Sequence, residues 1–214
     1  MLTRLLLALT VLVPTIAACQ EKDTRQAPPV APDAKLEGGL RIATFAGGCF
    51  WCMEGPFEKL TGVVSVTSGF TDGAELNPTY SQVSSGTTGH TEAIQVVFDP
   101  QKITYAQLVD VFWHNIDPTV ENRQFCDGGT QYRTGLYVHD AEQRAVAEAS
   151  LVKVKAQIKD PVVTPIKPAA TFYPAENYHQ DFYKTHPEHY LSYRTGCGRD
   201  ARLQAIWGAA AGAH

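Results

Sequence analysis

Two cysteines three positions apart are the residues of this sequence best suited to chemistry. Cys49 and Cys52 form a C-x-x-C pair directly after two glycines. Residues 41–46 read as a short strand and residues 49–60 as a helix, so the pair lies at a helix start. The helix dipole and the free backbone N–H groups there favour a thiolate over a thiol. We therefore predict a lowered pKa for Cys49 and a role as nucleophile.

The two residues between these cysteines are aromatic. Phe50 and Trp51 leave a helix in different directions, because neighbouring residues on a helix diverge. Either one is core and the other merely exposed, or both form an apolar wall beside the Cys49 sulfur. Such a wall suits a small methyl-bearing group. The pair is not a haem attachment site, because Met53 stands where the histidine would be.

Metal binding has little support elsewhere in the sequence. Cys126 and Cys197 each stand alone, whereas a zinc site of four cysteines needs two close pairs. Two structural disulfides remain an alternative for an exported protein. A domain of about 170 residues can, however, bury a sufficient core without them. Three histidines near the C-terminus are separated by a proline and lack an acidic partner, so no metal is expected at His179, His186 and His189.

Residues 1–18 have the pattern of a secretory signal. Arg4 precedes a short apolar run, which is far shorter than the roughly 20 residues that span a bilayer. The run ends in small residues before Cys19, similar to the lipobox of bacterial lipoproteins. We predict that Cys19 is lipidated, with plain cleavage after Ala18 as the alternative. Gln20 favours sorting to the outer membrane rather than the inner one.

The rest of the chain divides into a linker, a domain and a tail. Residues 19–39 contain three prolines and little apolar material, so they are predicted to form the anchor and a flexible tether. Residues 40–208 are the predicted domain and 209–214 a flexible tail. Hydrophobic residues make up 44% of the chain, enough for a packed core. The net charge of −4 and the lack of a basic run argue against a nucleic-acid partner.

Periodicity within the domain predicts alternating strands and helices. Apolar residues recur at helical spacing after Thr104, a plausible N-cap, and again within 141–158. Trp113 and Trp207 are predicted to be packing residues. Further strands are predicted at 62–69, 92–98, 135–139 and 162–169. This alternation indicates an α/β or α+β sheet domain.

An ordered series of segments resembles the A-type peptide methionine sulfoxide reductases. The series begins with Gly47-Gly48-Cys49-Phe50-Trp51 and continues through 77–80, 85–93, 127–133, 178–183 and 196–200, covering about residues 41–208. The resemblance implies a two-layer α/β (α+β) domain with a mixed sheet and a ferredoxin-like core. It also implies reduction of the S epimer of methionine sulfoxide, free or in proteins, by a monomer. Thioredoxin would be the electron donor, with no metal or other cofactor.

The resemblance also implies residue roles. Cys49 matches the attacking cysteine, and Glu92 matches the acid that protonates the sulfoxide oxygen. Without the family, an acidic residue at a strand start is more often solvated. The aromatic pocket for the methionine methyl matches Phe50 and Trp51. The polar groups around the oxygen match Tyr80, Asp127 and Tyr132.

The chemistry requires a second cysteine. Attack by Cys49 leaves a sulfenic acid, which another thiol converts to a disulfide that an external dithiol then reduces. Cys52 is close, but a helical i, i+3 pair must distort to form a disulfide. Cys197 lies between glycines in an expected mobile loop, matches the family's C-terminal recycling cysteine and is preferred as the resolving residue. Cys126 is expected to be a buried bystander.

Two other functions compete with this one. A thioredoxin-type thiol–disulfide oxidoreductase would use Cys49 and Cys52 and be indifferent to Cys197. A non-enzymatic envelope lipoprotein would hold its cysteines in structural disulfides. Cytoplasmic thioredoxin would not reach an exported reductase, so a thioredoxin-like donor in the cell envelope is expected.

Overall fold

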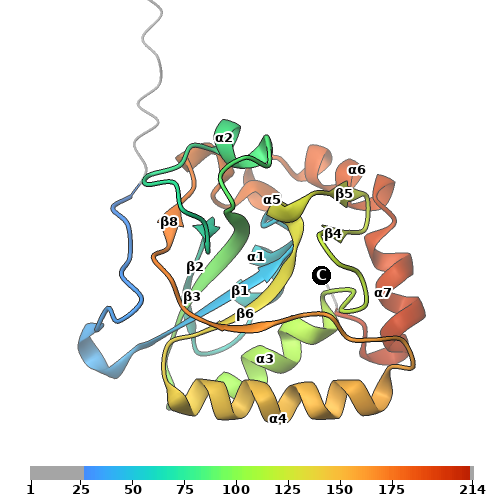
Figure 1. Ribbon diagram of the computed structural model, residues 1–214, viewed down its shortest axis with the longest axis horizontal. Helices are drawn as coiled ribbons and strands as arrows, with labels where there is room; N and C mark the ends of the chain where they lie inside the picture. The colour runs from blue at the N-terminus through green and yellow to red at the C-terminus, as the bar shows by residue number, and fades with distance from the viewer. Residues whose placement is uncertain (1–26, 213–214) are drawn as a thin grey trace, which may run out of the picture.

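A central sheet with helices packed against one face makes up the molecule (Figure 1). The computed structural model describes residues 27–212. The predicted signal peptide and Cys19 lie outside these residues. Within residues 27–212, no helix is both long and apolar enough to cross a membrane.

The sheet has six strands and is mixed. Their order is β7-β6-β1-β3-β2-β8, and every neighbouring pair is antiparallel except β6 and β7. The predicted mixed sheet is therefore confirmed. The succession β1-α1-β2-β3-α3-β6 is compatible with the ferredoxin-like core that the resemblance implied. The strands are β1 (Arg41–Gly47), β2 (Val63–Thr71), β3 (Thr91–Phe98), β6 (Thr134–Val138), β7 (Ile166–Pro168) and β8 (Tyr173–Pro174).

Most of these strands lie where the sequence predicts them. Two strands differ. The short β8 was not predicted. Of the predicted strand 162–169 only Ile166–Pro168 joins the sheet. Its first residues are engaged elsewhere, because the Val163 N–H donates to the Pro118 carbonyl at 2.9 Å.

Three helices cover one face of the sheet: α1 (Trp51–Glu58), α3 (Tyr105–His114) and α4 (Ala141–Gln157). The predicted N-cap of α3 is confirmed, since the Thr104 hydroxyl accepts from the Gln107 N–H at 3.2 Å. Asp140 caps α4 in the same way, accepting from the Gln143 N–H at 2.8 Å.

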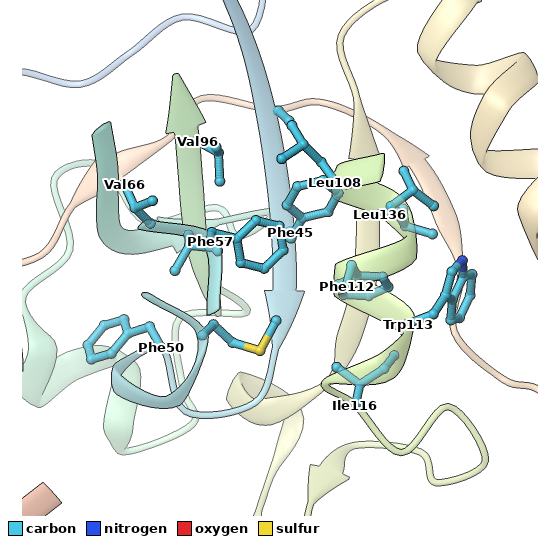
Figure 2. Packing of buried hydrophobic residues seen from close by; sticks show 14 of the residues in the cluster. Phe45, Phe50, Phe57, Val66, Val96, Leu108, Phe112, Trp113, Ile116 and Leu136 are labelled. Atoms are coloured by element: carbon cyan, nitrogen blue, oxygen red, sulfur yellow. The ribbon is translucent and has the colours of Figure 1, made fainter. Parts of the chain in front are cut away.

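The main core lies between these helices and the sheet (Figure 2). Phe45 of β1 stacks on Phe57 of α1 and on Phe112 of α3, with ring centroids 5.1 and 5.4 Å apart. A smaller cluster occupies the opposite face of the sheet and includes Ala46, Ala93, Tyr137 and Phe172. The fold is thus one sheet with one layer of helices, and irregular chain covers the other face.

Part of that cover comes from the N-terminal segment. Val30 forms a β-bridge with Phe172, and the Pro32 carbonyl lies 2.8 Å from Nδ1 of His139. Packed chain therefore begins before Leu40, where the sequence placed the domain start. At the other end, the Gly212 N–H donates to the His114 carbonyl at 2.8 Å, so the chain is packed beyond residue 208.

The C-terminal third holds helices that periodicity did not predict: α5 (Phe182–Thr185), α6 (Pro187–Gly196) and α7 (Arg199–Trp207). The predicted mobile loop around Cys197 is wrong, because Cys197 caps α6 and a left-handed Gly198 turns the chain directly into α7. Trp113 and Trp207 are buried packing residues, as predicted. The remaining elements are α2 (Tyr80–Ser84), the hairpin β4 (Arg123–Gln124) and β5 (Asp127–Gly128), and 3-10 turns at Glu37–Gly39, Thr130–Tyr132, Asn177–His179 and Gly208–Ala210.

Candidate active site

The turn between β1 and α1 presents Cys49. Gly48 has a φ of 80°, a left-handed conformation that favours glycine, and a side chain there would lie 2.5 Å from Cβ of Gln124. The helix begins at Trp51 rather than at Cys49. The Cys52 N–H donates to the Cys49 carbonyl at 3.1 Å. Cys49 therefore precedes the helix, and Cys52 lies in its first turn.

Sheet register brings the acid to the same place. β1 and β3 run antiparallel, with Phe45 opposite Ile94. The end of β1, which leads into Cys49, therefore meets the start of β3, where Glu92 lies. This pairing joins two residues far apart in sequence.

All the predicted catalytic and substrate-binding residues line one cavity of about 120 Å³. The lining is Cys49, Phe50, Trp51, Tyr80, Glu92, Asp127, Tyr132 and Tyr193. Of these, Tyr193 was not predicted, and the two candidate resolving cysteines are outside the lining. A larger hollow of about 310 Å³ between α3, α4 and Trp207 is lined by one carboxyl group, that of Asp110, and by no cysteine.

Glu92 is a buried acid without a cationic partner in the cavity. Its side chain is 1% exposed, and its Oε2 accepts the Phe50 N–H at 3.0 Å. Burial raises its pKa to about 8, with a smaller contribution from the nearby Asp127, although the Phe50 hydrogen bond opposes the shift. The carboxyl group is therefore protonated at neutral pH.

The aromatic wall is held from behind. The Trp51 ring stacks on Phe182 with centroids 3.8 Å apart and planes 7° apart. Its Nε1–H donates to Nδ1 of His179 at 3.2 Å. Burial lowers the pKa of His179 to about 4, so the ring is neutral and can accept this bond. His179 thus supports the wall.

Two phenols and a carboxyl group complete the polar side of the cavity. Tyr80 begins α2, and its backbone N–H donates to Glu176 at 2.9 Å. Burial raises the pKa of Tyr80 and of Tyr132, so both hydroxyl groups remain donors. Burial also raises the pKa of Asp127, against a lowering contribution from its hydrogen bond with Tyr193.

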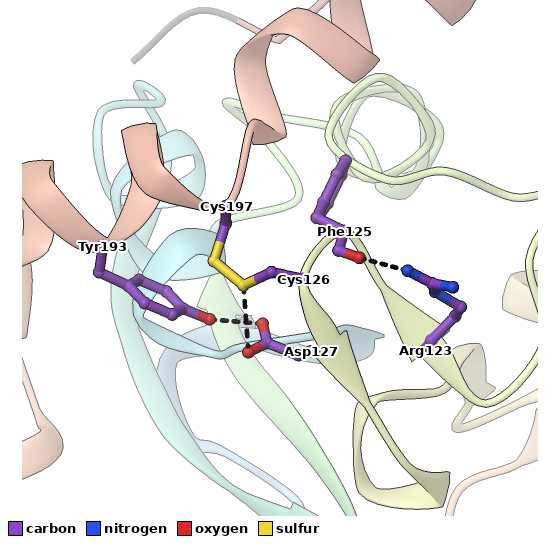
Figure 3. The surroundings of a disulfide bond; sticks show 6 residues. All are labelled: Arg123, Phe125, Cys126, Asp127, Tyr193 and Cys197. Atoms are coloured by element: carbon purple, nitrogen blue, oxygen red, sulfur yellow. Dashed lines mark hydrogen bonds between the residues drawn. A yellow bond between two sulfur atoms is a disulfide. The ribbon is translucent and has the colours of Figure 1, made fainter.

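Tyr193 of α6 is the site residue that the sequence did not reveal. Its hydroxyl donates to Oδ2 of Asp127 (Figure 3). The same hydroxyl lies within hydrogen-bonding reach of the Cys49 sulfur. The single hydroxyl proton can serve one of these acceptors at a time. Nothing in the spacing of α6 distinguishes Tyr193 from Tyr190, one turn earlier.

The C-x-x-C pair is buried and reduced. Cys49 is 6% exposed, Cys52 is 1% exposed, and their side chains hydrogen-bond each other. The predicted lowering of the Cys49 pKa is wrong: burial raises it, and the neighbouring Cys52 adds to the effect. The hydrogen bond from Cys49, followed by the charges of Arg199 and Arg194, lowers the pKa of Cys52 to about 6. The surroundings therefore favour negative charge on Cys52 over Cys49.

The other two described cysteines form a disulfide (Figure 3). Cys126 is exposed and bonded to Cys197, so its expected role as a buried bystander is wrong. The resolving role of Cys197 stays a prediction. In this structure the Cys197 sulfur is already bonded to Cys126. Sγ of Cys126, Sγ of Cys197 and a carboxylate oxygen of Asp127 lie within 4.8 Å of one another. A disulfide, however, is not a pair of thiolate ligands.

Replacing Glu92 by glutamine should change how stability depends on pH. The folded pKa of about 8 is above the reference value of 4.5, so the stability that Glu92 contributes is fully present below 4.5 and is lost as the pH rises to about 8. Relative to Glu92→Gln, the wild type should lose on the order of several kcal/mol of unfolding free energy across this window. Urea unfolding without reductant measures the difference. The control is the exposed Glu121→Gln, whose unfolding free energy should depend on pH as that of the wild type does. If the unfolding free energies of Glu92→Gln and wild type change in parallel with pH, Glu92 is not a buried neutral acid.

Comparison with known proteins gives one consistent result. Residues 41–211 match the family described as peptide methionine sulfoxide reductase. The chain is 50% identical over 169 residues to peptide methionine sulfoxide reductase MsrA of Bacillus licheniformis, covering 78% of this chain and 93% of the relative.

Solved structures agree with the sequence comparison. Reduced Mxr1 from Saccharomyces cerevisiae is similar, with a TM-score of 0.67 and 32% identity over 72% of this chain and 90% of that one. Methionine sulfoxide reductase A of Corynebacterium diphtheriae is similar, with a TM-score of 0.63 and 32% identity over 78% and 90%. The chain belongs to the peptide methionine sulfoxide reductase family, and its reaction is the thiol-dependent reduction of methionine sulfoxide to methionine.

Proposed function

We propose that this enzyme reduces the S epimer of methionine sulfoxide, free or within proteins, with Cys49 as nucleophile and Glu92 as acid. The observation that carries the proposal is the shared cavity, where a buried thiol and a buried protonated carboxyl group meet an aromatic wall. Sulfoxide reduction needs both groups, because the S–O bond is a poor electrophile until its oxygen is protonated.

The cavity supports a single orientation of the substrate. The methyl group lies against Phe50 and Trp51, and the oxygen faces Glu92 with the hydroxyl groups of Tyr80 and Tyr132 as further donors. Cys49 then attacks from a third direction. The methyl group, the oxygen and the attacking sulfur then occupy three fixed directions around the sulfoxide sulfur. Only one direction remains for the rest of the substrate, so only one epimer fits.

The first step consumes one thiol and yields methionine. The Cys49 proton passes to the Cys52 thiolate to which it is hydrogen-bonded, and Cys49 attacks the sulfoxide sulfur. Glu92 delivers its proton to the oxygen. The oxygen then forms a bond to the Cys49 sulfur, while its bond to the methionine sulfur and the bond formed by the attack both break. Methionine leaves and Cys49 is left as a sulfenic acid. The sulfoxide gains two electrons and Cys49 loses two.

We propose Cys52, in place of the preferred Cys197, as the resolving cysteine. Cys52 is free and hydrogen-bonded to Cys49, whereas the Cys197 sulfur is bonded to Cys126. The objection that a helical pair must distort loses its force because Cys49 precedes the helix. Cys52 attacks the sulfenic sulfur, the disulfide forms and water leaves.

A thioredoxin-like dithiol then restores the two thiols by exchange. A solved structure shows Mxr1 of Saccharomyces cerevisiae in complex with Trx2. For the present chain we propose a donor on the outer side of the inner membrane, because the sequence of residues 1–18 is that of a secretory signal.

Lipidation of Cys19 would hold the enzyme at the envelope, with the outer membrane favoured by Gln20. Cells that express the full chain should incorporate labelled palmitate into it, and the label and membrane association should be lost in Cys19→Ser. The matched control is Cys126→Ser, which should keep both. An unlabelled wild type found in the soluble fraction would contradict the anchor.

The central experiment uses chain lacking residues 1–19, dithiothreitol and resolved sulfoxide epimers. We expect consumption of the S epimer only, no turnover by Cys49→Ser, and turnover about 10²- to 10⁴-fold slower in Glu92→Gln, which cannot donate the proton. The exposed Glu121→Gln should match the wild type. If neither epimer is consumed while insulin disulfides are reduced, the thioredoxin-type alternative holds.

The resolving role is tested separately by one turnover without reductant. Cys52→Ser should release one methionine per enzyme and leave a sulfenic acid on Cys49 that dimedone labels. The control Cys197→Ser should still form the Cys49–Cys52 disulfide and escape labelling. Dimedone labelling in Cys197→Ser, and none in Cys52→Ser, would return the resolving role to Cys197.

A further inference from the structure

The Cys126–Cys197 disulfide joins two segments that each supply a residue to the cavity. The bonded residues are 71 positions apart, one in the hairpin between β4 and β5 and the other at the end of α6. Asp127 directly follows Cys126, and Tyr193 lies one turn before Cys197. Both line the substrate cavity. The disulfide therefore lies beside the contact between two site residues.

The path from the disulfide to the reacting sulfur is short. The Cys197 N–H donates to the Tyr193 carbonyl at 2.9 Å, and Sγ of Cys126 lies 3.6 Å from Oδ1 of Asp127. The Tyr193 hydroxyl donates to Asp127 (Figure 3). It also lies within hydrogen-bonding reach of the Cys49 sulfur. A shift of either segment would therefore change which acceptor receives the Tyr193 proton.

The base of the hairpin is anchored, but its tip depends on side chains from the C-terminal helices. Gln124 is fully buried, and its amide bonds both the N–H and the carbonyl of Asp117, at 2.9 and 2.7 Å. Phe125 has a left-handed φ of 52° and lies under the Arg199 guanidinium, 4.5 Å from ring centroid to Cζ. Cys126 itself is exposed. The disulfide is thus the covalent tie between an exposed tip and α6.

We propose that the Cys126–Cys197 disulfide is a clamp that holds Asp127 and Tyr193 in register across the substrate cavity, stays closed through the catalytic cycle, and slows the enzyme when it is reduced. This inference rests on the proposed function, because it concerns the same site. Cys126 and Cys197 are positioning residues, which act through Asp127 and Tyr193.

Opening the clamp is a thiol–disulfide exchange. An external dithiol is oxidised to its disulfide, the Cys126–Cys197 bond breaks and each sulfur leaves as a thiol. Such bonds persist in oxidising compartments and are rare where glutathione and thioredoxin keep thiols reduced. The clamp would therefore close after export, and the chain would be slow before it.

The test compares first-turnover rates of full-length enzyme purified in detergent. With limiting dithiol, the wild type has two alkylatable thiols besides Cys19 and a closed clamp. Excess dithiol, which is then removed, gives four alkylatable thiols besides Cys19 and an open clamp. We expect the open enzyme, and Cys126→Ser/Cys197→Ser, to reduce the S epimer about 10- to 100-fold more slowly, the effect of a small misplacement of site groups. Thr195→Ser, which alters α6 without breaking the bond, should match the closed enzyme.

A double-mutant cycle distinguishes a clamp that aligns Tyr193 from a disulfide that only stabilises the fold. In a Tyr193→Phe background the disulfide has no hydroxyl to align, so opening it should change the rate by less than about twofold. If opening the disulfide slows the first turnover equally in both backgrounds, the proposal is overturned, and the disulfide only stabilises the fold. Full-length wild type that has two alkylatable thiols besides Cys19 and cannot reduce the S epimer would instead overturn the proposed function.

The other alternative is that Cys126 and Cys197 relay electrons to the Cys49–Cys52 pair, and it predicts a different number of methionines released. If Cys126 and Cys197 accepted electrons in turn, fully reduced enzyme without reductant would release two methionines and end with two disulfides. The clamp predicts one methionine, with Cys126 and Cys197 still alkylatable under anaerobic conditions. Two methionines, together with equal first-turnover rates for open and closed enzyme, would overturn the clamp.

Discussion

The site depends on keeping the Glu92 carboxyl group away from water and from cations. An exposed carboxylic acid is ionised at neutral pH, and one beside an arginine is more acidic still. The cavity around Glu92 instead supplies aromatic rings, phenols and a single backbone donor from Phe50. That donor fixes the orientation of the group without supplying a full charge. This arrangement allows sulfoxide reduction at neutral pH, because Glu92 keeps its proton next to the position of the sulfoxide oxygen.

The fold keeps the Glu92 carboxyl group neutral and, close by, stabilises negative charge on Cys52. The two buried arginines, Arg194 and Arg199, lie on the Cys52 side of the cysteine pair and stabilise negative charge there. Glu92 lies on the Cys49 side, where burial disfavours charge. The turn at the start of α1 separates the two environments. A neutral acid and a thiolate can therefore coexist, one beside each cysteine.

Local pattern predicted the elements better than it predicted the electrostatics. Strands β1, β2, β3 and β6 and helices α3 and α4 followed from periodicity, and the order of motifs identified the cavity residues through the family. The sign of the Cys49 pKa shift was wrong because burial raises this pKa, and burial depends on tertiary packing that no local pattern encodes. Tyr193 and the Cys126–Cys197 bond depend on how α6 docks on the hairpin, and no local pattern encodes that contact.

The protonation state of Glu92 is the most direct test of this account. Infrared difference spectra of wild type and Glu92→Gln, recorded from pH 5 to pH 10, would isolate the carbonyl stretch of this one carboxylic acid. We predict that the band is present at pH 7 and disappears around pH 8, the pKa that burial gives the group. A band already lost by pH 5 would mean that Glu92 is ionised at neutral pH, and the proposed proton donor would then have to be another group.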